Sequence, residues 1–536
     1  MKKRILSILL VAALSVSCLA GCGGGKKEVG GESESSKIDW NEDPKSYPIV
    51  NEPITLKVGV SVGSVSQGDW NDLDWVKELE KQSGINLEFV VYQNAEAVNL
   101  MFTSQDYPDI AWGLGSDKQI ADAAMGGALY AWDDYMEKYA PNWDKYLKEN
   151  ENVRKIISNA DGKVYSLPMV RDEYYNYAVR DQWLIQKSWL DELGLAVPTT
   201  TDEFYNVLKA FKANAGKGSI PEDAIPYYTY GIINNVGGAL DVFNSYGIRL
   251  TATSHKVTLD DKGKVEFNYT NEAIKEPIKF LNKLVSEGLI PKESFTDSWD
   301  TYLTKIKATT PTIGCYHSYT NIDDTGLKTV PMAPLDTGNG ETPIIRSQDN
   351  VVQKGWFTIF KTCKYPEIAA RLANMIAEED WSVQASYGMI GGEETTVSKA
   401  EDGTYLVDEG DGTYEGLYVP GERVAYLITK ELHEKVKMEP TAKNYPRQQA
   451  VENIYAQYAM GTEHLYPNFI LSDENIDRVT ELELDITNHI KTTFAEWIMY
   501  GGVDEGWDDY IKQMKAYGVD EYLEILQDEL DAFNAQ

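Results

Sequence analysis

The sequence is poor in the residues that build metal centres and many catalytic sites. It has only 4 cysteines and 5 histidines in 536 residues. No Cys/His cluster with zinc-site spacing occurs, and no G-x-S-x-G, H-E-x-x-H or P-loop pattern. Acidic residues are so frequent that their spacing cannot identify a glycosidase pair. We therefore expect no metal, no cofactor and no enzymatic activity, and we expect Cys315 and Cys363 to be separate buried thiols rather than a disulfide.

Basic residues are also scarce. The chain has 50 Lys and Arg against 84 Asp and Glu, which gives a formal net charge of −34 at pH 7. A surface of this sign repels nucleic acid and anionic lipid, so binding of DNA or RNA is excluded as a function.

Only one long apolar run is present, at the start of the chain. Three basic residues at positions 2–4 precede an apolar stretch at 5–16, which is too short to span a membrane. It ends in Leu19-Ala20-Gly21-Cys22, which resembles the bacterial lipobox. We expect a signal peptide at 1–21, a lipid on Cys22, a flexible tether at 22–48 and a place on the extracytoplasmic face of the cell membrane. An ordinary secretory signal that contains a cysteine is the alternative.

The remaining chain is too long for one hydrophobic core and predicts two lobes. Residues 54–60 alternate as a half-buried strand does, residues 73–83 have helical spacing, and residues 87–91 alternate again. This β-α-β pattern predicts an α/β fold with a parallel sheet. Further along the chain, we expect these elements: helices at 95–104, 183–193, 272–287 and 366–378; a capping box at Thr200 and Glu203; strands at 107–112 and 356–360; mostly helix after 422.

Several stretches together resemble a known family. They are Tyr107-Pro-Asp-Ile, Asp161-Gly-Lys-Val-Tyr-Ser-Leu-Pro, Lys187-Ser-Trp-Leu-Asp-Glu-Leu-Gly-Leu and Val197-Pro-Thr-Thr-Thr-Asp-Glu-Phe. In this order they resemble the family 1 extracellular solute-binding proteins, which include the maltose-binding protein. The C-terminal Phe494-Ala-Glu-Trp-Ile-Met-Tyr-Gly-Gly resembles the longer LipO-like lipoprotein branch.

The resemblance implies a two-lobe periplasmic-binding-protein-like fold of type II, with hinge crossings and a helical C-terminal extension. It places crossings near 167–172, near 354–358 and after Gly392. Lobe 1 would then comprise 49–168 plus 357–395, and lobe 2 would comprise 172–355 plus 396–536.

Ligands of open α/β sheets bind beyond the carboxyl ends of the strands, which selects a few loops. A sugar has an apolar C–H face that aromatic rings cover, and hydroxyls that charged and amide groups bind. The candidates for ligand contact are Asp69, Trp70, Trp112, Arg171, Tyr174, Tyr177, Tyr316 and Trp356. The alternatives are that the aromatic residues belong to the core and that Arg171 is an ion-pair partner within the hinge.

By resemblance, the chain is expected to be the substrate-binding lipoprotein of an ABC transporter. Its expected partners are a sugar or oligosaccharide, the ABC permease subunits and, through the lipid alone, the membrane; we expect a monomer. A receptor for a peptide or another polar solute remains open, as does a surface enzyme that acts on polysaccharide.

Overall fold

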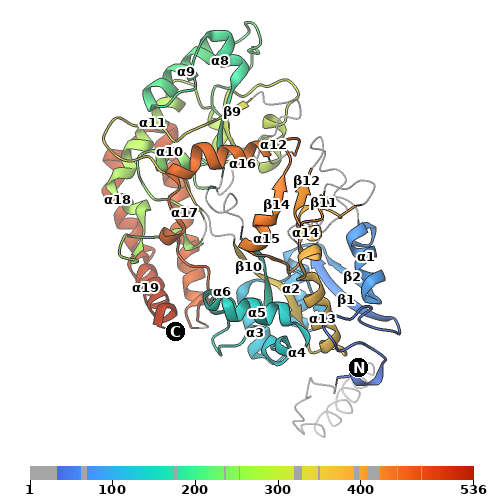
Figure 1. Cartoon of the computed structure of the whole chain (residues 1–536). Helices are drawn as coiled ribbons and strands as arrows, with labels where there is room; N and C mark the ends of the chain where they lie inside the picture. Colours follow the sequence, from blue (N-terminus) through green and yellow to red (C-terminus); the bar gives the residue numbers. More distant parts are fainter. Residues whose placement is uncertain are drawn as a thin grey trace, which may run out of the picture.

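Two large hydrophobic cores divide the protein into two lobes. The computed structural model describes residues 33–61, 69–172, 179, 181–234, 237–252, 254–318, 329–347, 351–391, 397–408, 423–442, 445–472 and 474–535. Figure 1 shows lobe 1 at the lower right and lobe 2 at the upper left. Cys363 lies in the first core and Cys315 in the second, each as a free buried thiol, as expected. Within the described ranges, no helix combines the length and the apolar character needed to cross a membrane.

Lobe 1 is built on a six-stranded sheet with the order β13-β4-β10-β3-β1-β2. The strands are β1 (Ile54–Ser61), β2 (Ile85–Tyr92), β3 (Ile110–Ala111), β4 (Ser166–Arg171), β10 (Val352–Ile359) and β13 (Leu427–Ile428). β1 pairs in parallel with β2 and β3, and β13 pairs in parallel with β4, whereas β10 is antiparallel to both β3 and β4. Five strands therefore end at the same edge of the sheet, and we call this edge the carboxyl edge.

Alternation and helical spacing explain the first β-α-β unit. In β1, Leu56 and Val58 are buried while Thr55 and Lys57 are exposed, so one face of the strand enters the core. The helix that follows ends at Gly84, whose φ of +77° suits glycine and whose N–H bonds to the Glu80 carbonyl. Helices surround the sheet: α1 (Asp74–Ser83), α2 (Ala95–Ser104), α3 (Asp117–Met125), α4 (Met136–Tyr139), α5 (Pro141–Glu149), α6 (Glu151–Ile157), α13 (Pro366–Ile376), α14 (Glu379–Tyr387) and α15 (Lys430–Lys435).

Lobe 2 has a smaller sheet and more helices. In its three-stranded sheet, β5 (Gln182–Gln186) lies between β8 (Cys315–Ser318) and β9 (Thr329–Met332), antiparallel to both. The short pair β6 (Thr258–Leu259) and β7 (Val265–Glu266) completes its strands among the described residues. The helices are α8 (Lys187–Leu193), α9 (Thr201–Ala213), α10 (Leu240–Ser245), α11 (Lys275–Ser286), α12 (Trp299–Ile306), α16 (Tyr445–Ala450), α17 (Ile476–Tyr500), α18 (Val503–Ala516) and α19 (Val519–Ala535).

Two local predictions in lobe 2 need correction. The predicted helix at 183–193 is wrong for its first four residues, which belong to β5 because strands on both sides satisfy their backbone groups. The capping box is half correct. Thr200 accepts the Glu203 N–H, but the Glu203 carboxylate binds the backbone N–H of Thr199.

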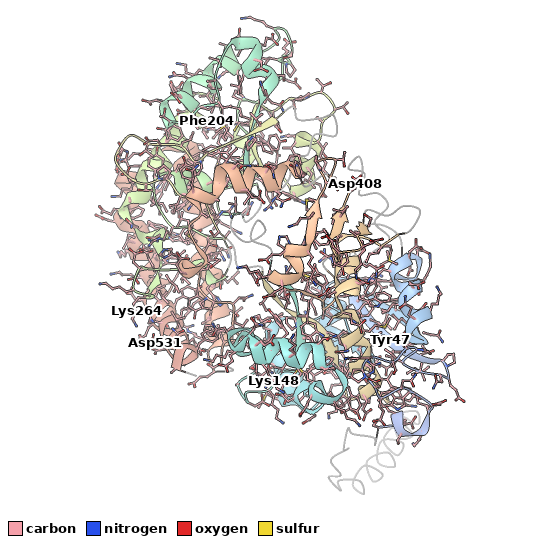
Figure 2. The ribbon with its side chains drawn as sticks, viewed as in Figure 1. Tyr47, Lys148, Phe204, Lys264, Asp408 and Asp531 are labelled. Carbon is pink, nitrogen blue, oxygen red and sulfur yellow. The ribbon has the colours of Figure 1, made fainter. Side chains whose placement is uncertain are left out.

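The C-terminal helices pack on lobe 2, as expected. Lys264, beside β7, forms an ion pair of 3.3 Å with Asp531 on α19, and Figure 2 labels both residues on this lobe. Residues 397–408 and 423–438, however, belong to lobe 1 and not to the predicted lobe 2. Their strand β13 pairs with β4, and Tyr405 and Val436 are buried in the first core. The small sheet of β11 (Val397–Lys399), β12 (Tyr405–Val407) and β14 (Val436–Met438) lies in the same residues. The third passage between the lobes therefore comes after Met438 rather than directly after Gly392.

The chain from residue 33 to residue 50, which we call the N-terminal strap, lies against α13 of lobe 1. The fully buried Arg371 guanidinium donates hydrogen bonds to the carbonyls of Asn41, Pro44 and Ser46. Tyr47, labelled in Figure 2, donates its hydroxyl to Glu378. The part of the predicted tether that follows residue 32 is therefore packed on the folded body.

Candidate functional site

The carboxyl edge of the lobe 1 sheet gathers residues from distant parts of the sequence. Trp70 follows β1, Trp112 follows β3, and Arg171 ends β4. The ring centroids of Trp70 and Trp112 are 5.4 Å apart. Trp356 on β10 packs against Gly113, where a Cβ atom would lie 2.4 Å from the indole ring. The order and direction of the strands thus bring together three of the predicted contact residues, Trp70, Trp112 and Trp356, and place Arg171 further out, at the end of β4.

Two of these aromatic residues are buried. Trp70 is 2% exposed and Trp112 is 1% exposed. Trp70 stacks on Phe89 at 5.2 Å between centroids, and Trp112 meets Trp75 edge to face at 6.3 Å. The two rings form an aromatic layer beneath the edge, and their contact with a ligand stays a prediction.

Asp69 and Trp356 retain exposed surface at this edge. Asp69 is exposed, and its carboxylate accepts the Asn71 N–H at the start of the short 3-10 helix Trp70–Asp72. Trp356 is partly buried. Both side chains can still meet a solute, and for both of them the predicted contact is untested.

Arg171 lies where the chain leaves β4 for lobe 2. Its guanidinium is over the Tyr387 ring at 5.4 Å, and its backbone N–H donates to the Val351 carbonyl beside β10. His433 is close by. Burial, and then the positive charges of Arg171 and Lys437, lower the pKa of His433 to about 4. At neutral pH the crossing therefore holds a charged guanidinium beside a neutral imidazole, and both can hydrogen-bond to hydroxyl groups.

The remaining predicted residues belong to other parts of the chain. Tyr316 is on β8 of lobe 2, opposite Leu184, and is 2% exposed. It packs in a small cluster with Tyr228 and Tyr302. Tyr174, Tyr177 and the proposed lipid site Cys22 lie outside the described residues.

A buried network of charged residues that sequence reasoning missed lies in lobe 2, where β8 ends and β5 begins. The Arg346 guanidinium is 3.6 Å from the Asp181 carboxylate and 3.5 Å from that of Asp241. His317 places Nδ1 at 3.1 Å from Asp241 and Nε2 at 2.8 Å from the Tyr227 hydroxyl. Burial raises the pKa of Asp241, but the neighbouring Arg346 and His317 outweigh it and hold the pKa below its usual value. The network joins residues from positions 181 to 346 that are far apart in the sequence, so no residue spacing predicts it.

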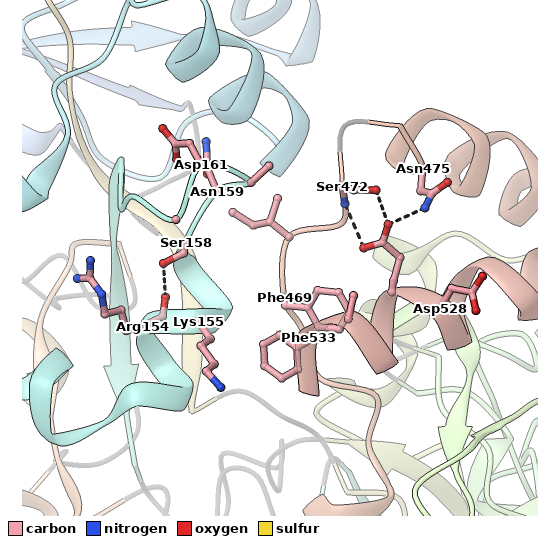
Figure 3. Close-up of a pocket in the computed structure, with 15 residues that line it drawn as sticks. Arg154, Lys155, Ser158, Asn159, Asp161, Phe469, Ser472, Asn475, Asp528 and Phe533 are labelled. Carbon is pink, nitrogen blue, oxygen red and sulfur yellow. Dashed lines mark hydrogen bonds between the residues drawn. The ribbon is translucent and has the colours of Figure 1, made fainter. Parts of the chain in front are cut away.

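A groove of about 880 Å³ separates the lobes at another place, shown in Figure 3. Arg154 and Lys155 lie on its lobe 1 wall. On the lobe 2 wall, Phe469 and Phe533 stack at 4.6 Å, and Glu529 accepts a hydrogen bond of 2.6 Å from the Asn475 amide. None of the predicted contact residues lines this groove. The lobe 1 residues that line the groove precede β4, so the groove lies at the amino end of that strand. It is therefore away from the carboxyl edge, where ligands of parallel sheets bind.

A metal-binding cluster is not evident in the part of the chain that the structure describes. No group of three or more His, Cys, Asp and Glu side chains there has the geometry to hold an ion. The chemistry available at the carboxyl edge is accordingly that of aromatic faces, a guanidinium, a carboxylate and an imidazole.

Comparisons with known proteins agree with this architecture. The fructooligosaccharide ABC transporter substrate-binding protein FusA of Streptococcus pneumoniae is 28% identical over 549 residues, covering 99% of this chain and 98% of FusA. Lipoprotein LipO of Bacillus subtilis is 26% identical over 252 residues, covering 44% of this chain and 45% of LipO. A solved structure of FusA in complex with kestose has a TM-score of 0.80 at 27% identity, covering 90% of this chain and 100% of that one.

The fold is shared more widely. An HMO-binding solute-binding protein from Bifidobacterium longum infantis has a TM-score of 0.76 at 22% identity, covering 90% of this chain and 99% of that one. These structures confirm the predicted two-lobe α/β fold with its helical C-terminal region. Residues 72–382 match the family described as bacterial extracellular solute-binding protein. That match spans more than half of the chain, so the protein belongs to the bacterial extracellular solute-binding protein family.

Proposed function

We propose that this protein is the substrate-binding lipoprotein of an ABC importer and that it captures an oligosaccharide between its two lobes. The observation that carries the proposal is the similarity to FusA, which extends over 99% of this chain and 98% of FusA. FusA is named for fructooligosaccharides and has been solved with kestose bound, so fructooligosaccharides are the first ligand class to test.

The chemistry of the carboxyl edge supports a sugar ligand. Hydroxyl groups need directed donors and acceptors, which Asp69 and Arg171 can supply, and a C–H face needs an aromatic partner such as Trp356. We propose these three as ligand contacts, together with Tyr174 and Tyr177 from the segment that follows Arg171. A solute that touches both lobes favours the closed arrangement by its greater affinity for it.

We further propose that the protein is anchored by a lipid on Cys22 after removal of residues 1–21, and that it works as a monomer that docks on permease subunits. The tetrad Leu19-Ala20-Gly21-Cys22 supports the anchor. Labelling of cells with radioactive palmitate tests it: the parent protein should take up label, and Cys22→Ala should not. Equal label in both would contradict the anchor.

The ligand is tested by isothermal titration calorimetry on a soluble form that begins at Gly23. The panel is kestose, nystose, maltotriose, diacetylchitobiose and a tripeptide. We expect saturable binding of one glycan class, with the glycan chromatographically unchanged afterwards, because the protein binds and releases its solute without chemistry. Saturable binding of the tripeptide alone would favour a peptide receptor, and consumption of a glycan would favour an enzyme.

A further inference from the structure

Four aromatic rings form a column at one edge of lobe 2. Trp299 stacks on Tyr302 with centroids 5.6 Å apart and 20° between the planes, and Tyr302 stacks on Tyr228 at 5.3 Å and 18°. Tyr230 meets Trp299 at 5.4 Å. The inner rings of Tyr228 and Tyr302 are buried, whereas Trp299 is 36% exposed and Tyr230 is partly exposed. The column is therefore closed at one end and open to solvent at the other.

The column stands at the carboxyl end of β8. The Tyr302 hydroxyl donates a hydrogen bond of 2.6 Å to the carbonyl of His317, one residue before the end of that strand. Gly237 allows the close approach, because a Cβ atom there would lie 2.9 Å from the Tyr302 ring. In the view of Figure 1, α12, which carries Trp299 and Tyr302, lies on the side of lobe 2 that is turned toward β12 and β14. Ligands of two-lobed proteins bind preferentially between the lobes.

Polar groups border the aromatic column. The Asp297 carboxylate accepts the Tyr228 hydroxyl and a hydrogen bond of 2.6 Å from the Lys305 ammonium. Lys305 is also 3.1 Å from the Tyr228 hydroxyl. The side chains of Asp297 and Lys305 retain partial exposure, 19% and 31% respectively. Both groups meet the column at Tyr228, the end opposite Trp299, and hold its inner end in place.

The outer ring, Trp299, is packed on one side and keeps 36% of its surface exposed. Trp299 is the first residue of α12, where the cap comes from Ser298, which accepts the Thr301 N–H. The inner rings Tyr302 and Tyr228 are buried, and Trp299 adds a ring at the solvent end of the column. A ring that is held from behind and keeps part of its face in water can stack on the apolar face of a sugar.

We propose that Trp299, assisted by Tyr230, is a stacking platform for one sugar ring of the bound oligosaccharide. The inference rests on the proposed function. It adds a contact on lobe 2 to those proposed on the carboxyl edge of lobe 1, so that the two lobes bind different parts of one oligosaccharide.

Calorimetric titration with kestose of the parent protein and of W299A, W299F and Y500A tests the platform. W299A should weaken binding about tenfold, because stacking of this kind is worth on the order of a tenfold change in affinity. W299F should keep most of the affinity, since it retains a flat ring. Tyr500, at the end of α17, is 71% exposed and serves as the matched aromatic control, which should leave the affinity unchanged.

A spectroscopic measurement separates a platform from a structural role. In protein labelled with 5-fluorotryptophan, the ¹⁹F resonance of Trp299 is assigned by its absence in W299F. Saturating kestose should shift it and reduce its H₂O/D₂O isotope effect, because the sugar covers the exposed ring. A purely structural residue would show neither change.

The outcomes are distinguishable. Parent protein that binds kestose or another oligosaccharide of the panel, with W299A binding it equally well, would overturn the platform and leave the proposed function standing. Equal losses in W299A and W299F would overturn the stacking role. Parent protein that binds no oligosaccharide would overturn both proposals.

Discussion

Replacing Arg371 by methionine should release the N-terminal strap from lobe 1. The buried guanidinium donates to the Pro44 carbonyl at 2.7 Å, to Ser46 at 2.9 Å and, more weakly, to Asn41 at 3.4 Å. Hydrogen bonds from a charged donor contribute roughly 1.5–3 kcal/mol each, and the loss of a buried charge offsets part of this. We expect the free energy of opening the strap to fall by about 3 kcal/mol.

Hydrogen exchange measures this local opening. Strap amides are bonded within the strap and to lobe 1: Asn41 to the Ile49 carbonyl, Ile49 to the Ser83 carbonyl, and Glu34 to the Lys364 carbonyl. A loss of about 3 kcal/mol corresponds to exchange faster by about a hundredfold in the strap peptides. Peptides from lobe 2 should exchange as in the parent protein.

Arg478→Met is the matched control. Arg478 also makes three hydrogen bonds, two of 2.7 Å to Glu521 and one of 2.8 Å to Glu481, but its side chain is 41% exposed. Water replaces exposed partners, so this change should cost little stability. Two results would refute the argument that burial decides the effect. One is strap exchange in Arg371→Met that stays within about threefold of the parent protein. The other is an equal loss of protection around the mutated residue in the two variants.

Three further predictions concern strain and pH. Gly113→Ala should destabilise the protein by about 1–3 kcal/mol more than Gly127→Ala in denaturant titrations. Both glycines have positive φ, but the new Cβ would lie 2.4 Å from the Trp356 ring in the first case and more than 4 Å from any neighbour in the second. Burial raises the pKa of Glu483, yet a hydrogen bond from His255 and the charge of Lys256 outweigh it and hold the pKa at about 2. The stabilisation that Glu483 provides is therefore complete above pH 4.5 and is lost as the pH falls toward 2. Glu483→Gln should flatten the profile of stability against pH in that window, and an unchanged slope would refute this. Burial and positive neighbours lower the pKa of His433 from 6.5 to about 4, so its contribution is complete above pH 6.5 and declines toward pH 4; His433→Phe should remove this decline in the same titrations.

Local patterns predicted most of lobe 1 because its first elements follow one another in sequence and in space. The alternation at 54–60, the helical spacing at 73–83 and Gly84 each act within a few residues, and the structure confirms them in β1 and α1. The strand β5 was missed because its pairing partners, β8 and β9, lie more than a hundred residues further along the chain. The two-residue β13 was missed because its partner β4 is also far away in the sequence, and with it the place of residues 397–408 and 423–438 in lobe 1.

The candidate site divides in the same way. The α/β sheet and the loops that follow its strands can be predicted from local patterns alone, because strand periodicity and turn residues are local properties. Only the tertiary structure decided that Trp70 and Trp112 are buried, since Phe89, Trp75 and the strands between them cover the rings. It alone also decided that Trp299 stands on Tyr302 at the end of β8, because that column exists only where α12 meets a strand end and a distant loop. Exposure depends on which surfaces meet, and that is fixed by long-range packing rather than by any spacing along the chain.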